Sequence, residues 1–241
     1  MEQFSTTFDA VFAANDLQEF ATEQNKQAFA ALCEHILTVN KVHNITAIKD
    51  VPGVITKHFA DSLTIAKHIP EGASVIDVGT GGGFPTLPLA IARPDLKITA
   101  IDSTAKKITH VQNTAHMFGL NGVTAIAGRA EELAQTKMRE SFDVATARAV
   151  SELRILCELT LPFVKIGGVL ISMKGASGEK ETRDAEKAIK QLGGQLIAEH
   201  KLTLKDADGN EDERYLVIVK KISRTPNNFP RQYAQILKKP L

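Results

Sequence analysis

An acidic residue, a glycine-rich loop and a second acidic residue form the most chemically suggestive pattern in the sequence. Asp77 stands two residues before Gly79, four glycines fall between Gly79 and Gly83, and Asp102 follows Gly79 by 23 positions. Glycines let the backbone turn through positive φ and let a ligand approach closely. An acidic residue at about that spacing can accept hydrogen bonds from both hydroxyls of a ribose. The pattern predicts a ligand that contains a ribose.

The residues of the loop favour one ligand of this kind over those that carry phosphate. The third glycine of the dinucleotide fingerprint would fall at Phe84, and no Gly-Lys-Ser/Thr ends the loop as in a Walker motif. The carboxylate of Asp77 disfavours a phosphate and suits a cationic amino-acid group. S-adenosyl-L-methionine has a ribose, a positive sulfonium and no phosphate. We therefore expect it at Gly79 and Gly81, with Asp102 on the ribose.

A third segment, Gly128-Arg129-Ala130-Glu131-Glu132, offers groups for the adenine. The backbone N–H of Ala130 and the carboxylate of Glu131 suit its amino edge. Structural alternatives remain open at each position. Asp77 could cap a loop amide, Asp102 could cap the following helix, and the charges at 129–132 could form a solvated first helical turn.

The elements expected to position these residues alternate between strands and helices. Apolar throughout, the strands are typical of a sheet with helices on both faces. A polar turn at 205–213 then joins two strands as a hairpin. The predicted fold is α/β, with strands at 74–79, 97–102, 123–128, 142–148, 168–174, 195–204 and 214–222, and helices at 85–93, 104–118, from Ala130, 152–164 and 179–192.

Two further segments flank this core, which spans residues 73–222. Residues 1–72 read as a helical extension, interrupted by a polar, loop-like stretch at 40–48. Residues 223–241 form a basic tail without acidic residues, and its prolines at 226, 230 and 240 predict an extended conformation.

Composition sets broad limits on the protein. The chain has 241 residues, is 43% hydrophobic and carries a net charge of +1, so no global field indicates a nucleic-acid partner. Cys33 and Cys157 match no metal or redox spacing and are expected to be buried thiols. Neither a signal peptide nor an apolar run of membrane-spanning length is expected, which favours the cytoplasm.

Several blocks resemble one family. They are 44–48 (Asn-Ile-Thr-Ala-Ile), 57–63 (Lys-His-Phe-Ala-Asp-Ser-Leu), 77–90, 129–131, 146–150 (Thr-Ala-Arg-Ala-Val) and the basic ending at 240–241. From about Asn40 onward the chain resembles the bacterial small-subunit ribosomal RNA methyltransferases RsmG, also called GidB. Thr86 departs from the Gly or Ser of many members, and Lys57 stands where Arg is also common.

The resemblance implies methyl transfer from S-adenosyl-L-methionine to N7 of one guanosine in the decoding-region loop of 16S rRNA. It implies a Rossmann-like methyltransferase core, here a mostly parallel seven-stranded sheet with an antiparallel last strand. Carried over by motif, the cofactor contacts are Gly79, Phe84, Ala130, Glu131 and Arg148.

Guanine N7 carries an in-plane lone pair and no proton, so its attack on the methyl group needs no general base. The sequence agrees, because no Asn/Asp-Pro-Pro-aromatic motif and no Pro-Cys pair follow the fourth strand. We expect Arg148 to contact the cofactor carboxylate or guanine O6 and so to position the reactants. As a structural alternative, Arg148 could bridge a carboxylate at the edge of the sheet.

For the RNA partner we look to local basic groups. Candidates are Lys41, Lys57 and His58 before the loop, and Arg224, Arg231, Lys238 and Lys239 in the tail. The expected substrate is 16S rRNA in the small subunit or its precursor, and the low net charge favours a folded ribosomal context over naked RNA. We expect a monomer without metal. An NAD-dependent oxidoreductase, a methyltransferase for a small molecule or protein, and a non-catalytic RNA-binding protein remain alternatives.

Overall fold

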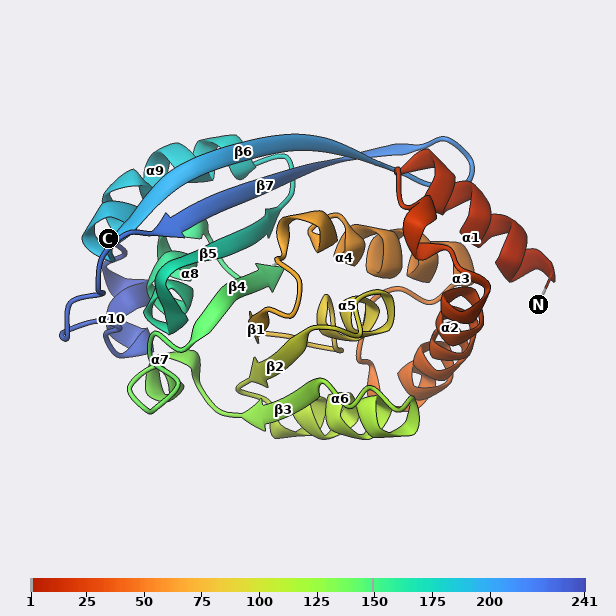
Figure 1. Cartoon of the computed structure of the whole chain (residues 1–241), viewed down its shortest axis with the longest axis horizontal. Helices are drawn as coiled ribbons and strands as arrows, with labels where there is room; N and C mark the ends of the chain where they lie inside the picture. Colours follow the sequence, from red (N-terminus) through yellow and green to blue (C-terminus); the bar gives the residue numbers. More distant parts are fainter. Residues whose placement is uncertain (1, 149) are drawn as a thin grey trace.

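A seven-stranded sheet crosses the molecule in the order β3-β2-β1-β4-β5-β7-β6 (Figure 1). The computed structural model describes residues 2–148 and 150–241, so Ala149 of the 146–150 block lies outside the described residues. The strands are β1 Ser74–Val78, β2 Lys97–Asp102, β3 Val123–Ala127, β4 Phe142–Arg148, β5 Val164–Lys174, β6 Gly194–Lys205 and β7 Glu211–Lys221.

The sheet has the predicted mixed topology. Strands β1 to β5 pair in parallel, while β7 lies antiparallel to both β5 and β6. The chain order reverses at β1, whose neighbours are β2 on one side and β4 on the other. In open α/β sheets, ligands bind outside the carboxyl ends of the strands at such a point. β5 begins earlier than predicted, because Val164 already pairs with Phe142.

Helices cover both faces of the sheet, as the apolar strands predicted. Successive residues of β1 point into different cores: Val75 packs with the N-terminal helices, and Ile76 packs with α8 and α9. The helices are α1 Glu2–Ala14, α2 Glu23–His43, α3 Val51–Gly53, a π-helix Val54–Ala60, α4 Asp61–Leu63, α5 Thr86–Ala92, α6 Ala105–Met117, α7 Ala130–Leu133, α8 Leu153–Thr160, α9 Gly178–Gln191 and α10 Tyr233–Lys238.

Packed aromatic rings join the N-terminal helices α1 and α2 to the π-helix. Phe8 and Phe12 of α1 lie 3.8 Å apart between ring centroids, and Phe29 of α2 lies 4.8 Å from Phe59. All four rings are fully buried. The π-helix that carries Phe59 is thereby fixed between α2 and the sheet.

The expected loop at 40–48 is wrong in its first part. α2 continues to His43 and ends at Asn44, whose φ of 47° is left-handed. The Asn40 side chain is buried: its Oδ1 accepts from the Thr46 N–H and its Nδ2 donates to the Ile48 carbonyl. Asn40 thus lies in the last turn of α2, and its side chain orders the loop that follows the helix.

The expectation of a wholly extended tail is also wrong. Residues 233–238 form α10, because the stretch between Pro230 and Pro240 is long enough for a short helix. Its Ile236 is fully buried against Ile155 and Leu159 of α8. The apolar contact therefore overrides the tendency of the flanking prolines.

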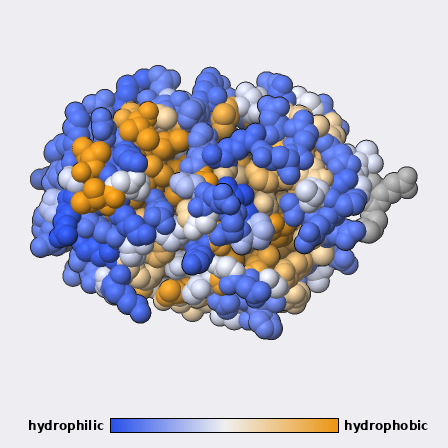
Figure 2. Space-filling model, in the orientation of Figure 1, coloured by the Kyte–Doolittle hydropathy of each residue, from blue (hydrophilic) through white to orange (hydrophobic). Residues whose placement is uncertain are grey.

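Much of the surface is hydrophilic on the face shown in Figure 2. Both cysteines are buried, as predicted. Among the described residues, no helix is long and apolar enough to cross a membrane.

Candidate functional site

A cavity of about 990 Å³ lies at the carboxyl ends of β1, β2 and β4. It brings together residues that are far apart in the sequence. All the predicted cofactor residues line it: Gly79, Gly81, Phe84, Asp102, Ala130, Glu131 and Arg148.

The glycine loop forms one wall of the cavity. Gly79 and Gly81 have φ of 77° and 59°, a region that side chains rarely adopt. A Cβ at Gly79 would lie 2.7 Å from Cγ2 of Val150, another cavity residue. At Gly81 the nearest neighbouring atom would be 4.0 Å away. The loop is therefore a backbone cradle that a ligand can approach closely.

Asp102 connects β2 to this loop. Its Oδ2 accepts from the Gly81 N–H at 3.1 Å, and its Oδ1 accepts from the Thr104 N–H at 2.8 Å. The structural alternative is thus realised in part, since the carboxylate orders the backbone before α6. Each carboxylate oxygen can accept more than one hydrogen bond. Asp102 can therefore still face a ribose while it fixes the loop.

Asp77 lies beneath the loop and does not line the cavity. Its side chain is buried, and its Oδ2 accepts from the Thr86 hydroxyl at 2.6 Å. Burial raises the pKa of this carboxyl to about 6, against the opposing hydrogen bonds from Thr86 and Thr80. Asp77 therefore supports the loop and α5 from below, and the expected direct contact with a cationic group has no geometric basis.

Arg148 and Arg214 share one buried carboxylate. Asp61 Oδ2 accepts from Arg148 Nη1 at 2.9 Å, and Asp61 Oδ1 accepts from Arg214 Nε at 2.7 Å. Arg148 Nη1 also donates to the Lys57 carbonyl at 2.7 Å. All three charged side chains line the cavity. The alternative in which Arg148 bridges a carboxylate is realised, and the bridge holds its guanidinium at the cavity wall.

His58 stacks on Phe84 and is buried beside the cavity. The two rings are parallel within 5°, with centroids 3.9 Å apart. Arg148 Nη2 lies 3.2 Å from His58 Nδ1, and because arginine only donates, Nδ1 accepts and Nε2 donates to the Thr46 hydroxyl at 2.7 Å. Burial, assisted by the Arg148 charge, lowers the pKa of His58 to about 3. His58 is thus a neutral support for Phe84 and Arg148.

The segment after β3 forms the far end of the cavity. Arg129 Nε donates to Glu131 Oε1 at 2.5 Å, and the Glu131 side chain is buried while that of Arg129 is exposed. Ala130 begins α7, where backbone N–H groups lack helical acceptors. This end therefore presents a carboxylate and a backbone donor, as expected for an adenine edge.

The loop after β4 is held by a lysine on β5. Lys174 donates to the Ser151 carbonyl and pairs with Glu181 at 2.7 Å. Glu181 in turn accepts from the Leu153 N–H at the start of α8. The pair fixes the segment beside Arg148.

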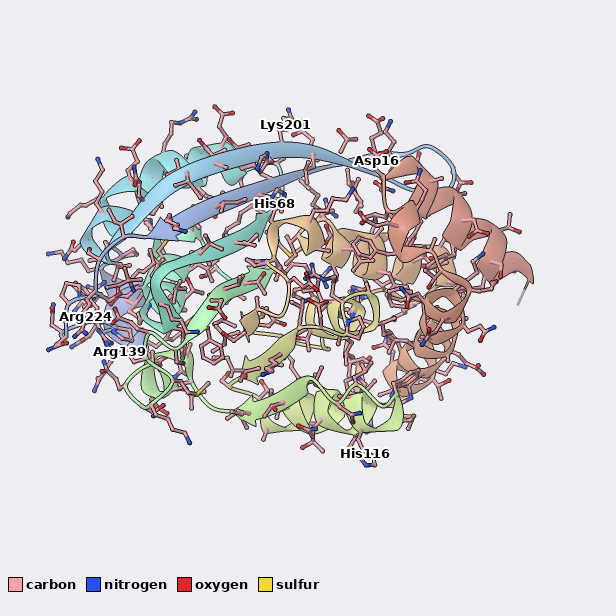
Figure 3. The ribbon with its side chains drawn as sticks, viewed as in Figure 1. Asp16, His68, His116, Arg139, Lys201 and Arg224 are labelled. Atoms are coloured by element: carbon pink, nitrogen blue, oxygen red, sulfur yellow. The ribbon has the colours of Figure 1, made fainter. Side chains whose placement is uncertain are left out.

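The cations proposed for RNA binding fall into two groups. The exposed group comprises Lys41, Lys57, Arg224, Lys238 and Lys239. His58 is buried, and Arg231 donates to the buried carboxylate of Glu158, so the structure places neither of these two as a free surface contact. Arg139 holds the tail near Arg224 by donating to the Thr225 carbonyl at 2.8 Å (Figure 3).

The cavity residues that sequence reasoning missed include Asp61, Lys174, Arg214 and Tyr233. Asp61 stood within a quoted block, and a carboxylate amid an apolar helical stretch was a signal of a buried partner. Lys174 ends one predicted apolar strand and Arg214 begins another, a similar signal. Tyr233 was missed because the tail was expected to be extended, whereas Tyr233 lies on the helix α10.

Comparisons with known proteins agree with this geometry. A family model described as rRNA small subunit methyltransferase G (GidB) matches residues 25–208. A protein of Leuconostoc mesenteroides named ribosomal RNA small subunit methyltransferase G is 42% identical, over 98% of this chain and 99% of that protein. One of the same name from Lactobacillus acidophilus is 41% identical, over 91% and 92% of the two chains.

Solved structures share the fold at lower identity. The O-methyltransferase from Bacillus cereus in complex with SAH has a TM-score of 0.56 and 19% identity, covering 79% of this chain and 91% of that one. TYW2 of M. jannaschii in complex with AdoMet has a TM-score of 0.54 and 19% identity, covering 67% and 75%. The sheet and its helices are those of Rossmann-like methyltransferases.

Proposed function

The chain belongs to the rRNA small subunit methyltransferase G family, and we propose that it methylates N7 of one guanosine in the decoding-region loop of 16S rRNA. It is a methyltransferase of small-subunit rRNA with S-adenosylmethionine as its methyl donor. Membership in this family removes the dinucleotide-dependent oxidoreductase from the alternatives. The proposal concerns which nucleotide and which atom of the rRNA accept the methyl group.

The cavity residues fit the methyl donor. A ribose beside Asp102 would meet a carboxylate, and the glycine wall at Gly79 and Gly81 leaves room for a close approach by the methionine part. Glu131 and the Ala130 N–H offer an acceptor and a donor to an adenine edge. When bound, the cofactor supplies an electrophilic methyl group. The residues of the chain bind the cofactor and orient it.

The charges in the cavity support a mechanism without a general base. His58 has its pKa lowered to about 3 and is engaged by Arg148 and Thr46, so it is a poor proton acceptor. Asp77 lies outside the cavity wall. Guanine N7 has no proton to lose, so catalysis by positioning suits this site. Arg148, fixed by Asp61, can donate to guanine O6 or to the cofactor carboxylate.

We place the RNA across the mouth of the cavity, with phosphate contacts from exposed cations. Lys57 lines the cavity and is exposed, which suits it to this role. Arg224, Lys238 and Lys239 provide a second basic site on the tail. The proposed partner is 16S rRNA within the small subunit or its precursor, bound by a monomer in the cytoplasm.

The test uses purified small subunits that lack the modification and S-adenosylmethionine with a labelled methyl group. We expect label in 16S rRNA and chain cleavage at one guanosine after borohydride and aniline treatment, which is selective for N7-methylguanosine. In a second set of subunits, the RNA contains 7-deazaguanosine in place of guanosine. This nucleoside has carbon in place of N7, so these subunits should take up no label. Label that persists in the deazaguanosine RNA would disprove N7 as the acceptor, and label on protein alone would disprove the RNA substrate.

A further inference from the structure

The C-terminal helix α10 brings Tyr233 into the wall of the cavity. The ring lies at the end formed by the segment after β3, where the Arg129 guanidinium stands 4.6 Å from its centroid. Ala130 and Tyr233 pack against the same small apolar cluster. That cluster joins α8 to α10 through Ile155, Leu159 and Ile236.

An ion pair fixes the position of this helix. Arg231, two residues before Tyr233, donates from Nε to Glu158 Oε1 at 2.8 Å and from Nη2 to Oε2 at 2.6 Å. Its backbone N–H adds a third bond to Oε1 at 2.9 Å. Glu158 is fully buried in α8, and Arg231 Nη1 also reaches the Lys239 carbonyl at 3.0 Å, beyond the end of α10. The tail is therefore docked by a carboxylate that has no access to water.

We propose that Tyr233 forms part of the adenine subsite of the methyl donor and that the Glu158–Arg231 ion pair positions it there. A tyrosine ring offers a flat apolar face to a purine, while Ala130 and Glu131 offer polar groups to its edge. The family match ends at residue 208, so Arg231 and Tyr233 lie outside the matched region.

The inference rests on the proposed placement of the adenine beside Ala130 and Glu131. It does not rest on guanosine N7 as the acceptor. Cofactor binding is measured without RNA, so its outcome is independent of which nucleotide is methylated. A role of Tyr233 in contacting RNA is the competing assignment, and it predicts no change in cofactor affinity.

The first experiment uses the unaltered chain, which contains two tyrosines, Tyr215 and Tyr233. Protein labelled with fluorotyrosine should give two fluorine NMR signals, assigned with the Tyr215→Phe variant. On titration with S-adenosylhomocysteine, we expect the Tyr233 signal to shift and the Tyr215 signal, whose hydroxyl binds Glu199 on β6, to shift less. A Tyr233 signal that moves no more than the Tyr215 signal at saturation overturns the proposal.

The second experiment measures S-adenosylhomocysteine affinity by calorimetry. Tyr233→Ala should bind about 10-fold more weakly, the scale of one base–aromatic contact, and Tyr233→Phe should bind as the wild type does. Leu237→Ala, an exposed position on the same helix, is the matched control. Wild-type affinity in folded Tyr233→Ala, with weakened RNA binding, would assign the ring to RNA instead.

The positioning role of the ion pair is tested on arginines of the same tail. Arg231→Ala should weaken S-adenosylhomocysteine binding as Tyr233→Ala does, whereas Arg224→Ala, at an exposed position, should not. Unchanged affinity in Arg231→Ala removes the ion pair from the account. If Tyr233→Ala does not fold, the fluorine signals of the unaltered chain decide the proposal.

Discussion

Two buried carboxylates, Asp61 and Glu158, each bind arginine, but they organise different parts of the molecule. Asp61 lies on the N-terminal side of the cavity and fixes the guanidinium groups of Arg148 and Arg214, which belong to the cavity wall. Glu158 lies on the opposite face of the sheet and fixes Arg231, which anchors the tail. Asp61 therefore holds two cavity residues directly, whereas Glu158 holds the tail segment that carries the cavity residue Tyr233.

The loss of each carboxylate should therefore lower the free energy of unfolding by a different amount. Without Asp61, two guanidinium groups that are only 15% and 20% exposed lose their charge partner in a junction between helix and sheet. Without Glu158, the arginine sits on a terminal segment that can move away from α8. Breaking a buried pair costs most where the remaining charge cannot escape.

The largest expected effect is that of Asp61→Asn. We expect a loss of about 3 kcal/mol in the free energy of unfolding, because two arginines lose their shared charge. Methyl transfer should fall about 100-fold, since Arg148 is no longer held in place. Denaturant unfolding and labelled-methyl transfer measure the two effects. Asp184→Asn on the exposed face of α9 is the control, and equal behaviour of the two variants would refute the role of Asp61.

A smaller loss is expected for Glu158→Gln, of about 2 kcal/mol in the free energy of unfolding. The tail can undock and hydrate Arg231, which limits the cost, and limited proteolysis should then cut near α10. Glu152→Gln, which removes an exposed pair with Arg154, should change stability little. If proteolysis of Glu158→Gln matches that of the wild type, the tail is held by other contacts.

The Asp61 side should also respond to acid through His58. Its pKa is lowered to about 3, so protons bind the unfolded chain first as the pH falls below the ordinary histidine value of 6.5. The free energy of unfolding should decrease as the pH decreases through this window, by about 1.4 kcal/mol per pH unit for this histidine. His58→Gln should show a shallower slope between pH 6.5 and 4. An unchanged slope would contradict the burial of His58 as its cause.

Asp77 should act with the opposite sign. Its pKa is raised to about 6, so its contribution to stability is complete below pH 3.8 and is lost as the pH rises through 6. Asp77→Asn cannot ionise. Its stability relative to the wild type should therefore increase from pH 4 to 6, by up to about 1.4 kcal/mol per pH unit. Thermal or denaturant unfolding across this range checks the sign. A relative stability of Asp77→Asn that decreases as the pH rises from 4 to 6 would contradict the prediction.

The smallest effects are expected for the exposed tail cations Arg224, Lys238 and Lys239. Their replacement by alanine should leave stability unchanged and reduce the salt dependence of RNA binding. The slope of log K against log salt should fall by about 0.7–0.9 for each phosphate contact removed. Arg231→Ala should instead change cofactor affinity with little change in this slope. The reverse pattern would exchange the roles of the exposed and buried tail arginines.

Local sequence determined the elements and the glycine wall of the cavity. Strand and helix periodicity, glycine spacing and the position of Asp102 after β2 depend on neighbours in the chain, so they could be predicted. The seven strands and the antiparallel β7 followed from these patterns and the family resemblance. The residues expected at the cofactor came together because the carboxyl ends of parallel strands meet at one edge of the sheet.

Only the tertiary structure decided which charges are buried and which partners they have. Asp61 meets Arg148 and Arg214 across 87 and 153 residues of chain, and Glu158 meets Arg231 across 73. The tertiary structure also buries His58, places Asp77 beneath the loop and brings Tyr233 to the cavity. An apolar surrounding in the sequence can signal that a charge is buried, but the partner of that charge depends on neighbours in three dimensions and is not encoded locally.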